Sequence, residues 1–279
     1  MRAAVLGSPV AHSLSPVLHR AAYDYLGLAD WRYDAIECDS GGLAALLGTM
    51  GSGWTGLSLT MPLKRTVLSL VDSIDPTARL ASAANTVLFR GGRRLGFNTD
   101  VPGMVAALGE HGVAPGAGAG TSATILGSGA TATSAMVALA ELGFGPVTVV
   151  ARRPHAARSV ARIGEGLGVQ VKVASLTDRA GLSADLAAPL VVSTLPSGVA
   201  DDLVGAVRDV AGALFDVVYE PWPTALADRW ADAGGTVVPG LDLLVHQAVA
   251  QVLLMTGWAG AENELLAVMR AASPAALKP

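Results

Sequence analysis

The sequence predicts an α/β protein with two domains, each built on a mainly parallel sheet. Strand-like apolar runs alternate with helix-like runs from one end of the 279-residue chain to the other, which is the pattern of sheets covered by helices. The length suits two domains of ordinary size. A stretch of glycine, alanine, proline and valine at residues 113–120 separates two such series and is interpreted as a linker.

The composition argues against several classes of protein. Hydrophobic residues make up 51% of the chain and charged residues 15%, whereas intrinsic disorder needs low hydrophobicity and high charge. The net charge of -4 gives no sign of a nucleic-acid-binding surface. Cys38 is the only cysteine, which excludes a disulfide framework and indicates a reducing compartment. We therefore expect a cytoplasmic protein with no nucleic-acid partner.

Two apolar stretches, residues 112–140 and 243–261, are interpreted as buried segments. The first is interrupted by glycine, serine, threonine and proline, and the second contains a histidine and two glutamines. A spanning helix needs about 20 mainly apolar residues. The apolar stretch at the N-terminus stops at Gly7, which is too short for a secretory signal. We therefore expect no membrane partner.

The first series of elements begins with a strand over residues 3–6 and a turn. Ser15 is expected to cap the helix that follows, with Pro16 in its first position and Gly27 after its end. Apolar patterning and a glycine-rich hairpin turn indicate the remaining elements. They are a strand over 31–36, a helix over 42–47, a strand over 56–59, and a hairpin of strands 86–89 and 95–98.

The second series consists of continuous apolar strands, as expected when both faces of a parallel sheet are covered. One domain boundary is expected in the helix after Asp100 and the other near residues 235–240. The expected strands cover residues 123–126, 147–150, 169–173, 190–193 and 214–217, and helices over 243–255 and 262–271 end the series.

A glycine-rich turn follows the first strand of the second series. It reads Gly127-Ser128-Gly129-Ala130-Thr131-Ala132 and leads into an apolar helix. In such a motif the first glycine permits the turn, the second admits a pyrophosphate, and the small third residue lets the helix pack on the strand. A glycine-rich turn also occurs without a ligand, but the order strand, turn and helix favours a dinucleotide site.

Two arginines favour NADP as the dinucleotide. Arg152 and Arg153 follow the second strand of this series, and no acidic residue lies between Glu141 and Glu165. An NAD site usually has an acidic residue there, whereas guanidinium groups suit a 2′-phosphate. The alternative is a pair of ordinary surface arginines, because 16 of the 19 basic residues are arginine.

Polar clusters interrupt the apolar background of the first series. Ser13 and Ser15 precede a helix, where an anion or a capping hydroxyl is favoured. Lys64, one of three lysines, lies in the first turn of a helix that Pro62 begins, a position that disfavours a cation. Two further side chains of interest are Asn85 at the start of a strand and Asp100, which is either a site residue or a helix cap.

These stretches together resemble the shikimate dehydrogenase family. They occur in the family's order over residues 7–247, and they are G-S-P-V-A-H-S-L-S-P, L-T-M-P-L-K, A-S-A-A-N-T, G-F-N-T-D, G-S-G-A-T-A, V-S-T-L-P-S-G, D-V-V-Y-E-P-W-P-T and P-G-L-D-L-L-V-H-Q. The resemblance implies reversible, NADPH-dependent reduction of 3-dehydroshikimate to shikimate, in the biosynthesis of aromatic amino acids. It implies a substrate domain at 1–101, a Rossmann-type NADP domain at 102–236, and C-terminal helices at 237–279 that return to the substrate domain.

The resemblance also implies roles for single residues. Lys64 and Asp100 would form the catalytic pair, and Ser13 and Ser15 would hold the substrate carboxylate. The other implied substrate contacts are Thr60, Lys64, Asn85, Asp100 and Gln247 around the ring, with Tyr219 lining the pocket. The implied NADP contacts are Gly127, Ser128, Gly129, Ala130, Thr131, Arg152 and Arg153, with Gly240 near the nicotinamide.

The chain departs from the family's pattern at three places. Ser58 stands where the family commonly has asparagine, and Ala130 stands where its nucleotide loop commonly has a second glycine. Ala151-Arg152-Arg153 replaces a common Asn-Arg-Thr. This last departure leaves open which of the two arginines holds the 2′-phosphate.

The implied residues suit the implied chemistry. Hydride reduction of a ketone leaves an alkoxide, which a lysine can protonate or stabilise, and a neighbouring carboxylate would orient that lysine. No metal is expected, because no two of the five histidines are four residues apart. The expected partner is a small-molecule substrate, and the chain is expected to be a monomer or a homodimer.

Three other functions remain open at this point. One is a quinate/shikimate dehydrogenase that prefers NAD, which the absence of an acidic residue after the second strand disfavours. Another is a two-domain folate-type dehydrogenase, which the paired serines and the N-T-D motif fit poorly. The third is a non-catalytic NADP-dependent binding protein, which the joint presence of Lys64, Asn85 and Asp100 disfavours.

Overall fold

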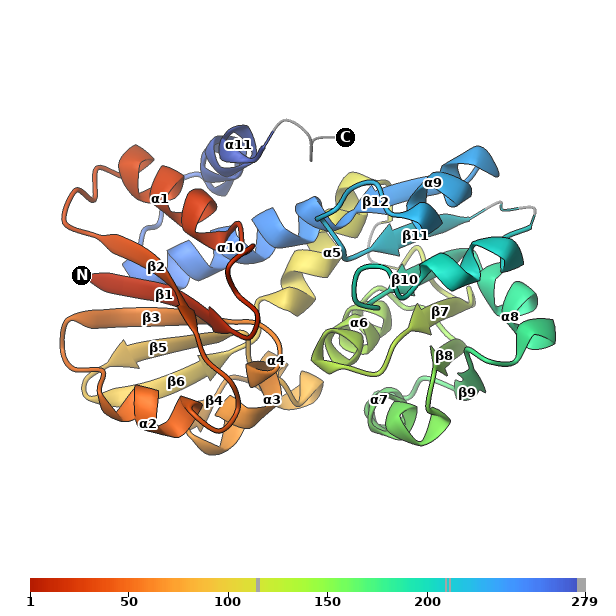
Figure 1. The fold of residues 1–279 in the computed structure, drawn as a ribbon, viewed down its shortest axis with the longest axis horizontal. Coiled ribbons are helices and arrows are strands. Elements are labelled where there is room, and N and C mark those ends of the chain that lie inside the picture. Colours follow the sequence, from red (N-terminus) through yellow and green to blue (C-terminus); the bar gives the residue numbers. More distant parts are fainter. Residues whose placement is uncertain (114–115, 209, 211, 275–279) are drawn as a thin grey trace. The chain divides into compact units, whose positions relative to one another are not determined.

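The structure is a computed structural model that describes residues 1–113, 116–208, 210 and 212–274. It divides into a first unit, Met1–Gly103 with Leu244–Pro274, and a second unit that covers Met104–Leu243. Each unit contains one six-stranded sheet with helices (Figure 1). The predicted α/β class is therefore confirmed. Residues 114 and 115 of the predicted linker lie outside the described residues.

The sheet of the first unit has the strand order β2-β1-β3-β5-β6-β4. Strands β1, β2 and β3 are parallel, whereas β5 is antiparallel to both β3 and β6. The strands are β1 (Arg2–Gly7), β2 (Arg32–Glu37), β3 (Trp54–Leu59), β4 (Ser73–Ile74), β5 (Thr86–Arg90) and β6 (Arg93–Phe97). The expected hairpin is present, and Gly91 and Gly92 at its turn have positive φ angles.

Helices cover both faces of this sheet. In Figure 1, α1, α10 and α11 lie on one face, and α2 and α3 lie on the other. The helices of this unit are α1 (Ser15–Tyr25), α2 (Leu43–Gly48), α3 (Leu63–Thr66), α4 (Pro76–Ala81), the end of α10 (Gly240–Thr256) and α11 (Glu262–Ala272), and a 3₁₀ turn covers Val67–Ser69.

The two faces of β3 differ in character. Leu57 and Leu59 belong to an apolar core that includes Leu43 and Leu47 of α2. Because successive side chains of a strand point to opposite faces, Ser58 is turned to the face that α10 covers. Buried polar side chains, among them Ser58 and Gln251 of α10, lie on this face of the sheet.

The prediction that Ser15 caps the first helix was wrong. Helix α1 begins at Ser15 itself, its N-cap residue is Leu14, and no side chain caps it. The hydroxyl of Ser13 instead accepts a hydrogen bond from the backbone N–H of Ser15, at 3.3 Å.

The sheet of the second unit has the order β12-β11-β10-β7-β8-β9, and all its neighbouring strands are parallel. The first strand is central and the chain winds outward from it twice, which is the doubly wound order of dinucleotide-binding domains. The strands are β7 (Ala123–Leu126), β8 (Val147–Ala151), β9 (Val171–Ser175), β10 (Leu190–Ser193), β11 (Ala213–Asp216) and β12 (Thr236–Pro239).

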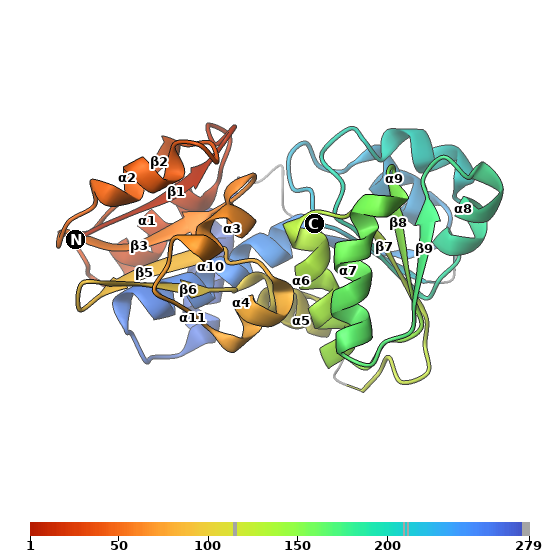
Figure 2. The ribbon, with the colours of Figure 1, turned by 90° about the horizontal axis from the view of Figure 1, so that it is seen from below.

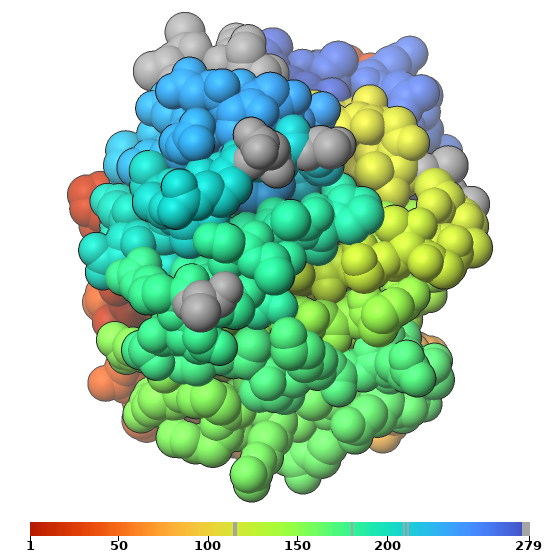
Figure 3. Space-filling view, turned by 90° about the vertical axis from the view of Figure 1, so that its right-hand side faces the viewer, coloured from red at the N-terminus to blue at the C-terminus, as the bar shows by residue number. Residues whose placement is uncertain are grey.

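Helices also cover both faces of the second sheet. Helices α6 (Ala130–Glu141) and α7 (Pro154–Gly166) lie side by side (Figure 2). A core of Leu186, Leu203 and Trp230 binds α8 (Arg179–Leu186), a 3₁₀ helix (Asp201–Ala206) and α9 (Ala225–Asp232) to the sheet. Figure 3 shows one face of this unit, with its green residues below and its blue residues above. No helix in the described ranges combines the length and apolarity needed to cross a bilayer.

Candidate functional site

Lys64 and Asp100 form a buried ion pair in the first unit. Lys64 lies on α3, Asp100 begins α5 (Asp100–Glu110), and the lysine Nζ donates to Oδ2 of the aspartate at 2.6 Å. The two side chains are only 14% and 5% exposed. A short charge-assisted bond in such surroundings fixes the ammonium in one position. The structure therefore brings together the two residues that the sequence proposed as a catalytic pair.

Asn85 holds the other oxygen of Asp100. Its Nδ2 donates to Oδ1 of Asp100 at 2.8 Å and to Oγ1 of Thr99 at 2.8 Å, and it lies 3.3 Å from Oε1 of Gln247. Its Oδ1 accepts from the backbone N–H of Thr99 at 2.8 Å. We call Lys64, Asn85, Thr99, Asp100 and Gln247 the polar cluster.

The hairpin explains why these side chains meet. Thr86 of β5 pairs with Phe97 of β6, so the residue before β5 lies opposite the residues after β6. Asn85 accordingly donates its backbone N–H to the carbonyl of Phe97 at 3.0 Å. The backbone N–H of Ala84 donates to the carbonyl of Lys64 at 2.8 Å. This bond holds α3 next to the start of β5.

Asp100 is not the cap of α5. The Oδ1 atom of Asn98 accepts from the backbone N–H of Val101 at 3.1 Å, and its Nδ2 donates to the carbonyl of Ala83 at 2.8 Å. The capping role that was open for Asp100 therefore belongs to Asn98. The carboxylate of Asp100 remains directed at Lys64 and Asn85.

Ser13, Ser15 and Thr60 belong to the same unit. Ser13 and Thr60 are half-buried, whereas Ser15 is 5% exposed. The hydroxyl of Ser15 hydrogen-bonds Tyr33. The side chain of Thr60, at the end of β3, packs against Gly7 so closely that a Cβ there would lie 2.3 Å from its Cγ2 atom.

Glu37, which sequence reasoning missed, holds the loop that carries Ser13. Its carboxylate accepts from the hydroxyl of Ser8 at 2.6 Å and from the backbone N–H of Val10 at 3.1 Å. Glu37 is the last residue of β2. An acidic residue at a strand end opposite a serine-rich loop was the available signal.

The glycine-rich turn of the second unit fits a dinucleotide pyrophosphate. Gly127 has φ +119°, and a Cβ there would lie 2.3 Å from Oγ1 of Thr194, so only glycine suits this turn. Gly129 is the N-cap of α6 and provides no side-chain cap, and a Cβ on it would meet no atom within 4 Å. The start of α6 therefore has no side-chain cap, and the space beside Gly129 is open, which suits the close approach of a pyrophosphate. Ala132 is fully buried, in keeping with close helix packing.

Arg152 and Arg153 are exposed directly after β8, the strand next to β7. Within the part of the chain that the structure describes, neither arginine forms an ion pair. Both guanidinium groups are therefore free of carboxylate partners in this region.

Gly240 and Tyr219 lie near the end of the second unit. A Cβ on Gly240 would lie 2.4 Å from the carbonyl of Val217, so backbone packing accounts for this glycine. Tyr219 follows β11 and is half-buried. Asp216 organises this loop, because its carboxylate accepts from the hydroxyl of Thr224 at 2.7 Å and from the backbone N–H of Val218 at 3.3 Å. Burial raises the pKa of Asp216.

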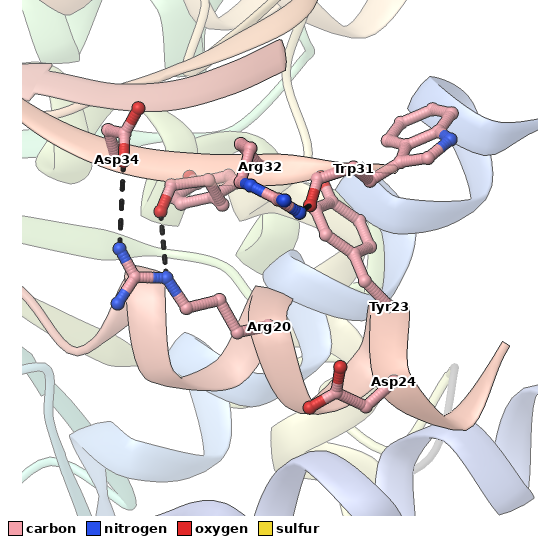
Figure 4. A pocket seen from close by; sticks show the side chains of 7 residues that line it. Arg20, Tyr23, Asp24, Trp31, Arg32 and Asp34 are labelled. Atoms are coloured by element: carbon pink, nitrogen blue, oxygen red, sulfur yellow. Dashed lines mark hydrogen bonds and ion pairs between the residues drawn. The ribbon is translucent and has the colours of Figure 1, made fainter. Parts of the chain in front are cut away.

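A separate pocket of about 260 Å³ in the first unit contains none of the predicted site residues. Figure 4 shows it between α1 and β2, where Arg20 donates to the carbonyl of Tyr33 at 3.0 Å and lies 3.7 Å from Asp34. Aromatic and charged side chains line it, and Arg20 and Asp34 among them form an ion pair. Among the described residues, no group of three or more His, Cys, Asp or Glu side chains is placed to hold a metal ion.

The doubly wound unit with its open glycine turn and the unit with a buried lysine–carboxylate pair define a two-unit α/β protein of the dinucleotide-binding class. The family model described as shikimate dehydrogenase substrate binding domain matches residues 5–87. The shikimate dehydrogenase (NADP(+)) of Symbiobacterium thermophilum is 33% identical and covers 98% of this chain and 94% of its own. That of an Anaeromyxobacter species is 37% identical and covers 96% and 95%.

Solved structures agree with these sequence relatives. The crystal structure of Mycobacterium tuberculosis shikimate dehydrogenase has a TM-score of 0.86 and 40% identity, and covers 97% of this chain and 99% of its own. The Thermus thermophilus enzyme in complex with NADP(H) and shikimate has a TM-score of 0.81 and 31% identity, and covers 98% and 100%. The chain belongs to the shikimate dehydrogenase family, and the resemblance seen in its motifs is confirmed.

Proposed function

We propose that this chain catalyses the reversible reduction of 3-dehydroshikimate to shikimate with NADPH. The observation that carries the proposal is the Lys64–Asp100 pair, held at 2.6 Å in a buried polar cluster. Relatives that are 33–37% identical bear the name shikimate dehydrogenase (NADP(+)), which supports the same reaction and cofactor. The residues present therefore suit a ketone reductase.

Lys64 is the proton donor in this proposal. NADPH, when bound, supplies the hydride. The ammonium of Lys64 gives a proton to the ketone oxygen as it becomes a hydroxyl, and takes it back in the reverse direction. Asp100 orients the ammonium through Oδ2, and Asn85 keeps the carboxylate in place through Oδ1. Water is largely kept from the pair by its burial, which strengthens the electrostatic stabilisation of an oxyanion.

The remaining site residues are assigned by their chemistry and by the family pattern. The hydroxyls of Ser13 and Ser15 bind the substrate carboxylate, Thr60 and Gln247 contact ring oxygens, and Tyr219 lines the pocket. Asn85 also belongs to this set, although both hydrogens of its amide already have acceptors in Thr99 and Asp100. A direct contact between Asn85 and the substrate therefore requires one of these bonds to be exchanged.

The second unit is assigned to NADP. Residues 127–131 hold the pyrophosphate, Arg152 or Arg153 holds the 2′-phosphate, and Gly240 lies near the nicotinamide. We assign the substrate to residues 1–101 and 237–279 and NADP to residues 102–236. The protein acts in the cytoplasm as a monomer or a homodimer.

The test is the loss of NADPH absorbance with 3-dehydroshikimate, with 3-dehydroquinate and without substrate, each repeated with NADH. The expected result is the fastest turnover with 3-dehydroshikimate and NADPH. A preference for NADH would indicate the NAD-dependent quinate/shikimate enzyme. Binding of NADPH without turnover of either ketone would indicate a non-catalytic binding protein, and either result would overturn the proposal.

A further inference from the structure

Gln251 is a fully engaged buried amide that the polar cluster does not include. It lies on α10, is 1% exposed, and its Nε2 lies 3.2 Å from the backbone carbonyl of Asn85 and 3.0 Å from Oγ1 of Thr86. Its Oε1 accepts from the hydroxyl of Ser58 at 2.6 Å and lies 3.3 Å from Nε2 of His19. A side-chain amide has two donor hydrogens and two acceptor lone pairs. All four are used, so the amide has one orientation.

The bonds continue from Gln251 to the ion pair. The hydroxyl of Thr86 donates to Oδ1 of Asn85 at 3.0 Å, and Nδ2 of Asn85 donates to Oδ1 of Asp100 at 2.8 Å. Oδ2 of Asp100 accepts from Lys64 at 2.6 Å. Gln251 is thus connected to Lys64 through an unbroken series of buried groups. In a low-dielectric interior, such a network fixes the position of each member.

The bonds also continue from Gln251 toward Ser15. The hydroxyl of Tyr33 donates to Oγ of Ser58 at 2.6 Å, and Tyr33 also hydrogen-bonds Ser15. His19 stacks on the ring of Tyr33, with ring centroids 3.9 Å apart. Because Oε1 of Gln251 can only accept, Nε2 of His19 must carry the hydrogen. Burial lowers the pKa of His19 to about 3, so this ring is neutral at physiological pH.

We propose that Gln251 is a positioning residue that fixes the Lys64–Asp100 pair through Thr86 and Asn85. The proposal rests on the function proposed above. Ser58 cannot take over the contact that Gln251 makes with Asn85. Its hydroxyl donates to the amide oxygen of Gln251, and it is Gln251 that contacts the backbone carbonyl of Asn85. The amide from α10 therefore spans the space between β3 and Asn85, and it makes the ion pair dependent on the helix.

The experiment compares Gln251→Leu with wild type. Leucine has a similar volume and forms no hydrogen bonds, so Asn85 loses a constraint while the space stays filled. A displacement of catalytic groups by about 1 Å can lower the rate about 100-fold. We expect kcat for shikimate oxidation with NADP⁺ to fall about 10- to 100-fold, with NADP⁺ affinity unchanged.

Thr124→Val is the matched control. Thr124 is 1% exposed, and its hydroxyl donates to the carbonyl of Asp185 at 2.6 Å in the second unit. This variant also loses a buried hydrogen bond, outside the network. It should lower Tm without a change in kcat, whereas Gln251→Leu should lower both. A similar fall of kcat in the control would show that lost stability is the cause and would overturn the proposal.

Thr86→Val tests the route. If Gln251 acts through Thr86, the effects of the two substitutions on kcat should not multiply, because effects on one coupled route do not add. The kcat of the double variant Thr86→Val/Gln251→Leu should then be no lower than that of the less active single variant. Multiplied losses would overturn the proposed route. If Gln251→Leu does not fold, the proposal is tested with Ser58→Ala and Thr86→Val instead, since each of these variants should lower kcat.

Two results would contradict the role of Gln251 directly. One is a folded Gln251→Leu protein with kcat within about twofold of wild type, well below the loss expected from misplaced groups. The other is unchanged kcat in both Ser58→Ala and Thr86→Val. Failure of the proposed function is seen separately, because the wild-type protein would then not oxidise shikimate with NADP⁺ at all.

Discussion

Replacement of Lys64 by methionine should remove both catalytic rate and stability, because one ammonium provides both. At 2.6 Å, the Coulomb attraction to Asp100 is about 6 kcal/mol for an effective dielectric constant of about 20. Desolvation of two groups that are 14% and 5% exposed offsets much of it. Removal of one partner from a buried pair typically costs about 3–5 kcal/mol. Because Asp100 keeps its bond from Asn85, we expect a loss near the lower end of that range.

The same substitution should also lower the catalytic rate. General acid catalysis contributes about 10²–10⁴-fold, so kcat should fall by about that factor. The KM for shikimate should change much less, because the lost interaction is concentrated in the transition state. Binding of NADP⁺, measured by calorimetry, should be nearly unchanged, since the glycine turn belongs to the second unit.

A second variant separates the two effects. In Lys64→Met/Asp100→Asn, no uncompensated charge remains, and Asn85 can still donate to the new amide oxygen. Replacement of a whole buried pair by neutral groups is often close to neutral in stability. The double variant should therefore regain most of the unfolding free energy lost in Lys64→Met, measured by denaturant unfolding, and none of its kcat.

Two results would refute this reasoning. A folded Lys64→Met protein that keeps more than about a tenth of wild-type kcat would contradict proton donation, for which a loss of at least about 100-fold is expected. Slow product release could hide the chemical step, so a single-turnover measurement of hydride transfer must give the same answer. A double variant as unstable as Lys64→Met would contradict the ion-pair explanation of the stability loss.

Three further predictions concern cofactor choice, substrate binding and acid stability. Replacement of Arg152 and Arg153 by glutamine should weaken NADP⁺ binding about 10- to 150-fold, from about 1.5–3 kcal/mol per charged contact, and equal losses for NADP⁺ and NAD⁺ in calorimetry would contradict the assignment. Alanine at both Ser13 and Ser15 should raise the KM for shikimate more than it lowers kcat, whereas a lowered Tm with normal KM would indicate a structural role. The pKa of His19 is about 3 in the folded protein and 6.5 in the unfolded chain, so wild type should lose about 1.4 kcal/mol per pH unit as pH falls from 6.5 toward 3. Unfolding free energies of His19→Gln between these pH values should lack that slope, and an equal slope in both proteins would exclude His19 as its cause.

Most of the fold could be predicted from apolar patterning, and the errors in the predicted bounds have local causes. The strand expected over residues 169–173 is found at Val171–Ser175. Val169 instead donates its backbone N–H to the carbonyl of Gly164 at 2.9 Å, in the turn that ends α7. Its apolar side chain therefore belongs to a helix end, which periodicity cannot distinguish from a strand start.

Strand β4 was missed because its two residues carry too little pattern. Helix α3 has only four residues, and it was expected from Pro62 rather than from apolar periodicity. Helix α4 did carry a local signal, since Asp75 precedes Pro76 and accepts from the backbone N–H of Ala78 at 2.9 Å. An acidic N-cap followed by proline is a helix start that sequence reasoning could have used.

The residues that position the polar cluster could not be predicted together, because each comes from a different element. Tyr33, Ser58 and Gln251 lie on β2, β3 and α10, and taken singly each fits an ordinary buried position. One local sign was available, since Gln247 and Gln251 are four residues apart and so lie on one face of an apolar helix. A buried amide without hydrogen bonds costs about 1–3 kcal/mol by mutational measurements. Two glutamines on one buried face are therefore tolerated only where both side-chain amides have hydrogen-bond partners. This spacing in an apolar helix thus predicts a polar site on the face of the helix that carries the glutamines.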